Sequence, residues 1–212
     1  RPMASPARRL RRVLAAGTLC AACLLAIANI AVLPLDPSGG GARGLLEINT
    51  SIQTEFTRTY KTFAWGGDGG GSGAGSSVEF TVALRKVLAR FISERGITSM
   101  YDAPCGAMVW TQRFITDIRQ QVPRFRYHGI DVVAHVVEAN KAKFARDPLT
   151  EIHIGDMTSD PIPEGFDMIL SRDALQHLTF KQIHGALRRF AESDATWTVI
   201  GKDCSPHAGA DS

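Results

Sequence analysis

The sequence predicts an α/β fold built on a doubly wound, mostly parallel sheet. Strand and helix signals alternate over residues 98–200, which is typical of parallel strands joined by right-handed helical crossovers. Four short segments also lie at or just beyond the C-terminal ends of predicted strands, where an open parallel sheet binds its ligand. These segments are residues 102–106, 129–131, 155–157 and 166–173.

Hydrophobic spacing places the elements in order. Apolar residues recur at helical intervals between 82 and 92, which predicts a helix over residues 78–95. Ser76 or Ser77 would cap this helix and Gly96 would end it. The predicted strands beyond it are residues 98–102, 125–131, 151–155, 166–171 and 196–200. The predicted helices between them are residues 108–121, 134–146 and 180–193.

The N-terminal part of the chain has an uneven charge distribution. Residues 1–12 hold five arginines and no acid, although the formal net charge of the whole chain is only +3. Residues 13–33 carry no charge and would be about 30 Å long as a helix, enough to cross a bilayer. We therefore expect a basic cytoplasmic tail (1–12) and a transmembrane signal anchor (13–33) in a single-pass type II protein of the ER or Golgi membrane. A secreted or organelle-targeted protein is the alternative.

Glycine and proline dominate the connection to the predicted sheet. Residues 34–77 form this connection, and within it residues 46–63 are compatible with a helix. The Gly/Ser-rich part is typical of a flexible linker, with a mobile lid before the core as the functional alternative. We therefore expect a linker and Gly/Ser-rich lid, a folded domain over residues 78–201, and a tail over residues 202–212.

Metal and nucleic-acid sites find little support in the sequence. The CxxC pair at residues 20–23 lies inside the apolar run, and no zinc-binding spacing is present, so no metal is expected. A disulfide between Cys105 and Cys204 stays an open alternative in a lumenal setting, although their predicted positions at the ends of non-adjacent strands disfavour it. We expect His128 and His153, which lie in predicted strands, to be structural. No basic stripe or RNA-binding motif is present, so nucleic acid is not an expected partner.

Polar residues at the strand ends form the candidate ligand site. Gly106 begins a turn into a helix, where the missing Cβ lets a ligand approach the backbone. Asp102 can accept hydrogen bonds from a cationic or amino-bearing group, and Asp131 is placed to bind ribose hydroxyls. Asp156 and Met157 can contact the edge and face of a base. Because the first turn is not a GxGxxG loop, it fits an uncharged nucleoside tail better than a dinucleotide.

These motifs resemble those of class I S-adenosylmethionine-dependent methyltransferases. More narrowly, the chain is similar to a methyltransferase-domain group with a D-x-P-C-G first motif (residues 102–106) and an R-D-x-L-x-H-L fourth motif (residues 172–178). As in that group, Trp110 follows the first motif, while Trp65 and a Ser-Gly-x-Gly-Ser segment at residues 72–76 precede it. The resemblance implies a Rossmann-like fold, S-adenosylmethionine as the cofactor, and a lid formed by the Gly/Ser segment.

The resemblance also implies roles for single residues. Cofactor contacts are implied for Asp102, Cys105, Gly106, Asp131, Asp156, Met157 and Arg172. Trp65 and Trp110 are assigned to substrate binding. Asp173 and His177 are four residues apart and would share a face if a helix begins there, so that either could take a proton from the acceptor. The alternative is that Asp173 caps this turn and His177 only hydrogen-bonds locally.

The predicted function is methyl transfer to an unidentified small-molecule or glycan acceptor. The glycan hypothesis depends only on the expected membrane topology. Two departures from the family favour an alternative. Ala107 stands where many relatives have an acid, and the predicted sheet is apparently truncated after its fifth strand, without the usual antiparallel pair. The fifth strand would then expose an unpaired edge. The alternative is a catalytically inactive, truncated methyltransferase-like binding or scaffold module.

Overall fold

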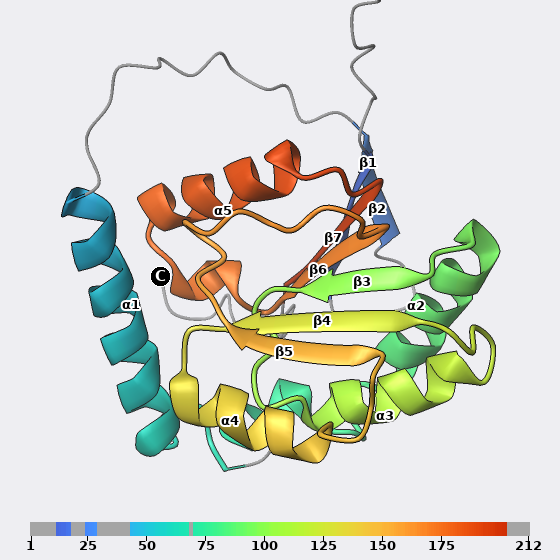
Figure 1. Ribbon diagram of the computed structural model, residues 1–212, viewed down its shortest axis with the longest axis horizontal. Helices are drawn as coiled ribbons and strands as arrows, with labels where there is room; N and C mark the ends of the chain where they lie inside the picture. Colours follow the sequence, from blue (N-terminus) through green and yellow to red (C-terminus); the bar gives the residue numbers. More distant parts are fainter. Residues whose placement is uncertain (1–11, 18–23, 29–42, 68–69, 203–212) are drawn as a thin grey trace, which may run out of the picture.

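A twisted sheet forms the centre of the molecule in the computed structural model, which describes residues 12–17, 24–28, 43–67 and 70–202 (Figure 1). The strand order over these residues is β2-β1-β7-β6-β3-β4-β5. The five parallel strands of the predicted core are β3 (Ser99–Asp102), β4 (Arg126–Asp131), β5 (Thr150–Ile154), β6 (Met168–Arg172) and β7 (Trp197–Lys202). The doubly wound, mostly parallel sheet is therefore confirmed.

Helices cover both faces of this sheet, as Figure 1 shows. They are α2 (Val82–Arg95), α3 (Val109–Arg119), α4 (Ala134–Lys143) and α5 (Phe180–Glu192). Successive strand residues point to opposite faces. Met100 therefore joins the larger core cluster with α2, α3 and α4, whereas Tyr101 joins a second cluster with Phe190 of α5.

The start of α2 differs from the prediction. Thr81 is the N-cap residue, so the helix begins after the predicted serine caps. Both serines are engaged in the preceding turn: the Ser77 hydroxyl accepts a hydrogen bond from the Phe80 N–H, and the Ser76 hydroxyl donates to the Ser72 carbonyl. Gly96 ends the helix in the left-handed conformation, at φ 63°, as predicted.

The predicted transmembrane helix over residues 13–33 is not formed by the described part of that run. Arg12–Gly17 forms β1, which pairs in parallel with β7, and Leu24–Ala28 forms β2, which pairs antiparallel with β1. An uncharged apolar run fits a sheet strand as well as a membrane helix, and the edge of β7 offers it hydrogen-bonding partners. No helix within the described ranges is long and apolar enough to span a bilayer.

The pairing of β1 also corrects the expectation of an exposed edge on the last predicted strand. β7 is hydrogen-bonded to β6 on one side and to β1 on the other. The predictions for the basic tail, for the C-terminal tail beyond residue 202 and for Cys20, Cys23 and Cys204 lie outside the described residues.

A helix occupies much of the predicted linker. α1 (Arg43–Lys61) stands beside the C-terminal ends of β3, β4 and β5 (Figure 1). The side-chain amide of Gln53 donates a 3.1 Å hydrogen bond to the carbonyl of Val132, in the loop after β4. Ile52 and Tyr60 are buried. A short 3₁₀ turn, η1 (Ala74–Ser76), follows in the Gly/Ser segment, so this region is folded against the core.

The connection from β5 to β6, residues 155–167, contains no helix and is described throughout. It contacts α5 at one very close point. A Cβ atom added to Gly185 of α5 would collide with the backbone carbonyl of Thr158. Only glycine lets the two backbones approach this closely.

Candidate functional site

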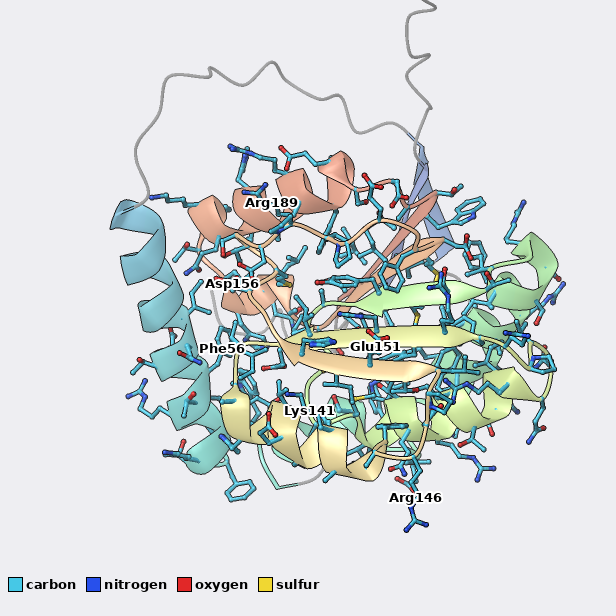
Figure 2. The ribbon with its side chains drawn as sticks, viewed as in Figure 1. Phe56, Lys141, Arg146, Glu151, Asp156 and Arg189 are labelled. Atoms are coloured by element: carbon cyan, nitrogen blue, oxygen red, sulfur yellow. The ribbon has the colours of Figure 1, made fainter. Side chains whose placement is uncertain are left out.

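A cavity of about 380 Å³ lies at the C-terminal ends of the parallel strands. Side chains from α1 contribute to its wall, and Figure 2 shows Phe56 on the side of α1 that faces the sheet. All eleven site residues predicted from the sequence line this one cavity: Trp65, Asp102, Cys105, Gly106, Trp110, Asp131, Asp156, Met157, Arg172, Asp173 and His177. Their individual roles stay predictions.

The turn after β3 forms the floor of the cavity. The Gly106 N–H donates a 3.0 Å hydrogen bond to Oδ2 of Asp131, and the Val133 N–H donates a 2.9 Å bond to Oδ1. Gly106 has φ +57°, and a Cβ there would lie 2.9 Å from the Ser72 hydroxyl oxygen. Burial raises the pKa of Asp131 to about 6, although both N–H donors lower it. The carboxylate is thus fixed in place, and each oxygen keeps a lone pair for a ligand hydroxyl.

Asp102 lies at the end of β3 and is only 3% exposed. Its Oδ2 accepts a 2.6 Å hydrogen bond from the Tyr127 hydroxyl. Burial raises the pKa of Asp102 to about 7, while the Tyr127 hydrogen bond and the charge of Arg172 lower it and Asp131 raises it. A cationic group entering the cavity would stabilise the ionised form of this carboxyl group.

Asp156 follows β5, and its two carboxylate oxygens differ in their hydrogen bonding. Oδ1 accepts a 2.7 Å hydrogen bond from the Thr158 N–H. Oδ2 is buried and has no hydrogen-bond partner among the described residues. Leaving a buried acceptor unsatisfied is costly, so a donor on a ligand fits at this point. Met157 adds an apolar surface next to it, with its sulfur 3.9 Å from the Ser171 hydroxyl.

The end of β6 brings a charged pair to the cavity. A terminal guanidinium nitrogen of Arg172, Nη2, lies 2.6 Å from Oδ2 of Asp173. The same nitrogen donates a 2.8 Å hydrogen bond to the carbonyl of Gly75. The guanidinium carbon lies 5.6 Å from the centre of the Trp110 ring, within cation–π range. Arg172 therefore joins the end of β6 to both the Gly/Ser segment and α3.

The predicted shared helix face of Asp173 and His177 is wrong. Asp173 has φ +50°, which interrupts any helix at that point. Only a 3₁₀ turn follows, η2 (Leu175–His177), and Ala174 rather than Asp173 is its N-cap residue, with no side-chain cap. Both residues still line the cavity.

Aromatic side chains form the wall opposite the strand ends. The His177 ring centre lies 4.8 Å from that of Trp65, and the two planes are tilted by 35°. Trp65 also lies 5.8 Å from the rings of Phe56 and of Tyr60. Burial lowers the pKa of His177, while Asp173 acts in the opposite direction. The imidazole is therefore mainly neutral at neutral pH and can accept a proton.

One known protein family matches more than half of this chain. Residues 101–207 match the family described as methyltransferase domain. The chain belongs to this family. The resemblance to class I S-adenosylmethionine-dependent methyltransferases is thereby confirmed. No curated protein matches the sequence.

Several solved methyltransferases are similar to this chain over part of their length. The O-methyltransferase of a trans-AT PKS multienzyme of Brevibacillus brevis, in complex with S-adenosyl-L-homocysteine, is 18% identical, with 59% of this chain and 45% of that chain covered and a TM-score of 0.42. DesVI of Streptomyces venezuelae is 18% identical, with coverages of 61% and 53% and a TM-score of 0.48. An amino pentose methyltransferase from Micromonospora echinaspora is 19% identical, with coverages of 50% and 43% and a TM-score of 0.41. The chain spans about half the length of these proteins.

Three residues that shape the candidate site were missed from the sequence. Tyr127 holds Asp102, as described above. The Tyr60 hydroxyl lies 2.7 Å from the Ser72 hydroxyl, which accepts a 3.0 Å hydrogen bond from the Ala107 N–H. The sequence did contain a signal for Tyr60, because Tyr60 follows Phe56 at helical spacing within residues 46–63, which are compatible with a helix. Ser72 and Tyr127 act through contacts between segments distant in the chain, which no local pattern reveals.

Proposed function

We propose that the chain is an S-adenosylmethionine-dependent methyltransferase acting on a small-molecule acceptor. The observation that carries the proposal is the buried, unpartnered Oδ2 of Asp156, in the same cavity as Asp131 and Asp102. An exocyclic amino group of a purine supplies the donor that this oxygen lacks. The three carboxyl groups together match the base, the ribose and the ammonium end of one nucleoside-type cofactor.

The cavity residues divide the cofactor between them. Asp156 and Met157 would hold the adenine by its edge and face. Asp131 would bind the ribose hydroxyls, and Gly106 leaves room for them beside the turn. Asp102 would receive the cationic ammonium group. When bound, the cofactor supplies an electrophilic methyl group on a positively charged sulfur.

The aromatic wall supports a particular class of acceptor. Phe56, Trp65 and His177 offer flat rings and few hydrogen-bonding groups. Sites of this composition bind ligands with an apolar or aromatic body and one or two polar groups. A glycan requires many more hydrogen bonds than these side chains provide. We therefore favour a small, largely apolar or aromatic acceptor that carries a hydroxyl or amino group.

The residues at the end of β6 are placed to orient and deprotonate this acceptor. Arg172 and Asp173 form a fixed polar pair that can position the acceptor for in-line attack. The acceptor lone pair forms the new bond to the methyl carbon, the carbon–sulfur bond breaks, and its electrons neutralise the sulfur. His177 then receives the proton released by the acceptor oxygen or nitrogen on a ring nitrogen.

Calorimetric titration of the full chain with S-adenosylmethionine and with S-adenosylhomocysteine tests the proposal. We expect one saturable site with micromolar affinity and at least ten-fold weaker binding by Asp131→Ala. Glu138→Ala, an exposed acid on α4, is the matched control and should bind normally. Absence of binding by a correctly folded chain would refute the cofactor site.

A transfer assay separates the enzyme from the alternative. Isotope-labelled cofactor is incubated with a panel of phenols, aromatic amines and simple sugars. Labelled phenol or amine products support the proposed acceptor class, and labelled sugars would reverse it. Cofactor binding without transfer to any acceptor would instead favour the catalytically inactive binding or scaffold module.

The cellular location remains a prediction from the sequence. The arginines of residues 1–12 and the uncharged run over residues 13–33 support a signal-anchored protein of the secretory pathway. The pairing of Arg12–Gly17 with β7 supports the competing possibility that this run completes the sheet. Alkaline extraction of membranes from cells that express the full chain distinguishes the two, because only an anchored chain stays in the pellet.

A further inference from the structure

A second group of polar side chains lies outside the cavity, on the strands β4 and β5. His128 of β4 is directly opposite Glu151 of β5 in the parallel register. His153 is two residues further along β5 and therefore points to the same face as Glu151. None of the three lines the cavity. Figure 2 shows Glu151 on β5, which is the outermost strand at this end of the sheet.

The potential ligand atoms of the three side chains lie close together. Oε2 of Glu151 lies 3.5 Å from Nδ1 of His128 and 3.6 Å from Nε2 of His153. These separations are longer than good hydrogen bonds. They are close to the roughly 3.4 Å between two ligand atoms bound tetrahedrally to zinc. All three ligand atoms lie within 4.8 Å of one another.

We propose that His128, Glu151 and His153 bind a divalent transition-metal ion of the zinc type, with a fourth position open to water. Two imidazoles and one carboxylate are a ligand set that zinc uses in proteins. Imidazole favours zinc and its neighbours in the first transition row over magnesium or calcium, which prefer oxygen ligands. The site is separate from the proposed methyl transfer and does not depend on it.

The surroundings hold His128 in position for this role. Its ring stacks on Tyr101 at 5.1 Å and on His153 at 4.8 Å, and the Phe166 ring lies 5.4 Å away. Ligands on paired strands are held more rigidly than ligands on loops.

The site is also accessible and can adjust. The side chains of His153 and Glu151 are 55% and 68% exposed, so small rotations can shorten the longest ligand separation. The nearby cation Arg126 lies over the Phe166 ring and donates to the carbonyl of Gly165 at 2.7 Å. The guanidinium therefore has its own partners. A metal ion bound here would crosslink β5 to β4 at the edge of the sheet.

Zinc titration of the full, chelator-treated chain by calorimetry tests the site. We expect one zinc ion per chain at this site and at least ten-fold weaker binding by both Glu151→Gln and His153→Ala. These side chains are exposed, so the fold should be kept, which circular dichroism checks. His184→Ala, which removes an exposed histidine from α5, is the matched control and should bind zinc like the unmodified chain.

Cobalt(II) absorption identifies the ligands, because the CxxC pair at residues 20–23 could also take up metal. The proposed site predicts d–d bands that disappear in Glu151→Gln and in His153→Ala. Zinc should also raise the unfolding temperature of the unmodified chain and of His184→Ala, but not of the two ligand variants. Absence of binding, or equal binding and equal spectra in all four proteins, would overturn the proposal.

Discussion

Arg172 donates a 2.8 Å hydrogen bond to the carbonyl oxygen of Gly75, a residue 97 positions earlier in the chain. The bond joins the end of β6 to the Gly/Ser segment (residues 70–77), of which residues 72–76 line the cavity. The same nitrogen also contacts Asp173. One guanidinium group thus connects the predicted acceptor side of the site to the Gly/Ser segment that lines it.

Replacement of Arg172 by lysine should loosen the Gly/Ser segment. Lysine keeps the positive charge, but its single ammonium cannot reproduce the planar contact with both partners. Loss of a charge-assisted hydrogen bond is worth about 1.5–3 kcal/mol, so we expect S-adenosylmethionine to bind roughly ten-fold more weakly. Hydrogen exchange of residues 70–77 should accelerate. Arg113→Lys, at an exposed site on α3, is the control; equal exchange in both variants would contradict the prediction.

Two glycines with nearly the same backbone conformation form a matched pair. Gly106 has φ +57° and Gly96 has φ +63°, but a Cβ meets the hydroxyls of Ser72 and Tyr60 only at Gly106. Gly96→Ala should lose about 1 kcal/mol of stability through backbone strain alone and should bind the cofactor normally. Gly106→Ala should lose more stability and bind the cofactor at least ten-fold more weakly.

Chemical denaturation and calorimetry measure both effects of this pair. The difference between the two variants isolates the steric contact at the cavity floor from the shared conformational strain. If both variants bind the cofactor equally well, the turn after β3 does not contact it.

Asp102→Asn should stabilise the unliganded chain at high pH while weakening cofactor binding. The folded pKa of about 7 lies above the ordinary value of 3.8. Between these two pH values the unfolded state has lost the proton that the folded state still holds, so the stability of the unmodified chain falls as the pH rises from about 4 to 7 and stays low above 7. Asparagine avoids that loss and can still accept from Tyr127, so we expect a gain of roughly 1–3 kcal/mol at pH 8. The gain should shrink steadily as the pH falls toward 5.

Urea unfolding of both proteins at pH 5 and pH 8 checks the Asp102 prediction. The unmodified chain should also release protons on cofactor binding near pH 7, because the ammonium group favours the ionised carboxylate. Calorimetry in buffers of different ionisation enthalpy counts these protons. A variant that is less stable than the parent at pH 8 would show that the charged carboxylate supports the fold.

His177→Gln should slow turnover without weakening cofactor binding. Loss of a general base reduces turnover by about 100-fold or more, while the Kd for the cofactor should change less than three-fold. Because burial lowers the pKa of His177, the kcat of the unmodified chain should fall only below its usual pKa of 6.5. That acidic limb should be absent in the variant. His184→Gln is the control, and unchanged kcat in His177→Gln would leave the residue without a catalytic role.

Much of the core could be predicted because local pattern and tertiary structure agree there. The nearly continuous apolar run of residues 166–171 predicted a central strand, and acids at or just beyond the ends of three parallel strands had to reach the same edge of the sheet. Asp102, Asp131 and Asp156 therefore gathered in one cavity as the strand order required. Their spacing along the chain was sufficient for this conclusion.

The remaining features depend on information that local sequence does not contain. The apolar run of residues 13–33 suits a membrane helix and a strand equally, and the pairing of Arg12–Gly17 with β7 cannot be read from this run alone. Asp173 adopts a left-handed conformation, which ends the helical spacing expected between it and His177. The Ser72 hydroxyl reaches the Ala107 N–H across 35 residues. The cluster of His128, Glu151 and His153 forms only once β4 and β5 are in register.

The contact between Gly185 and Thr158 places a strict demand on a position far from any ligand. The Thr158 N–H donates a hydrogen bond to Oδ1 of Asp156. The loop that contacts α5 through Thr158 therefore also positions the buried Oδ2 of Asp156. Any side chain at residue 185 would push the helix and this loop apart. In a saturation-mutagenesis survey, Gly185 should therefore tolerate as few substitutions as the residues of the cavity itself.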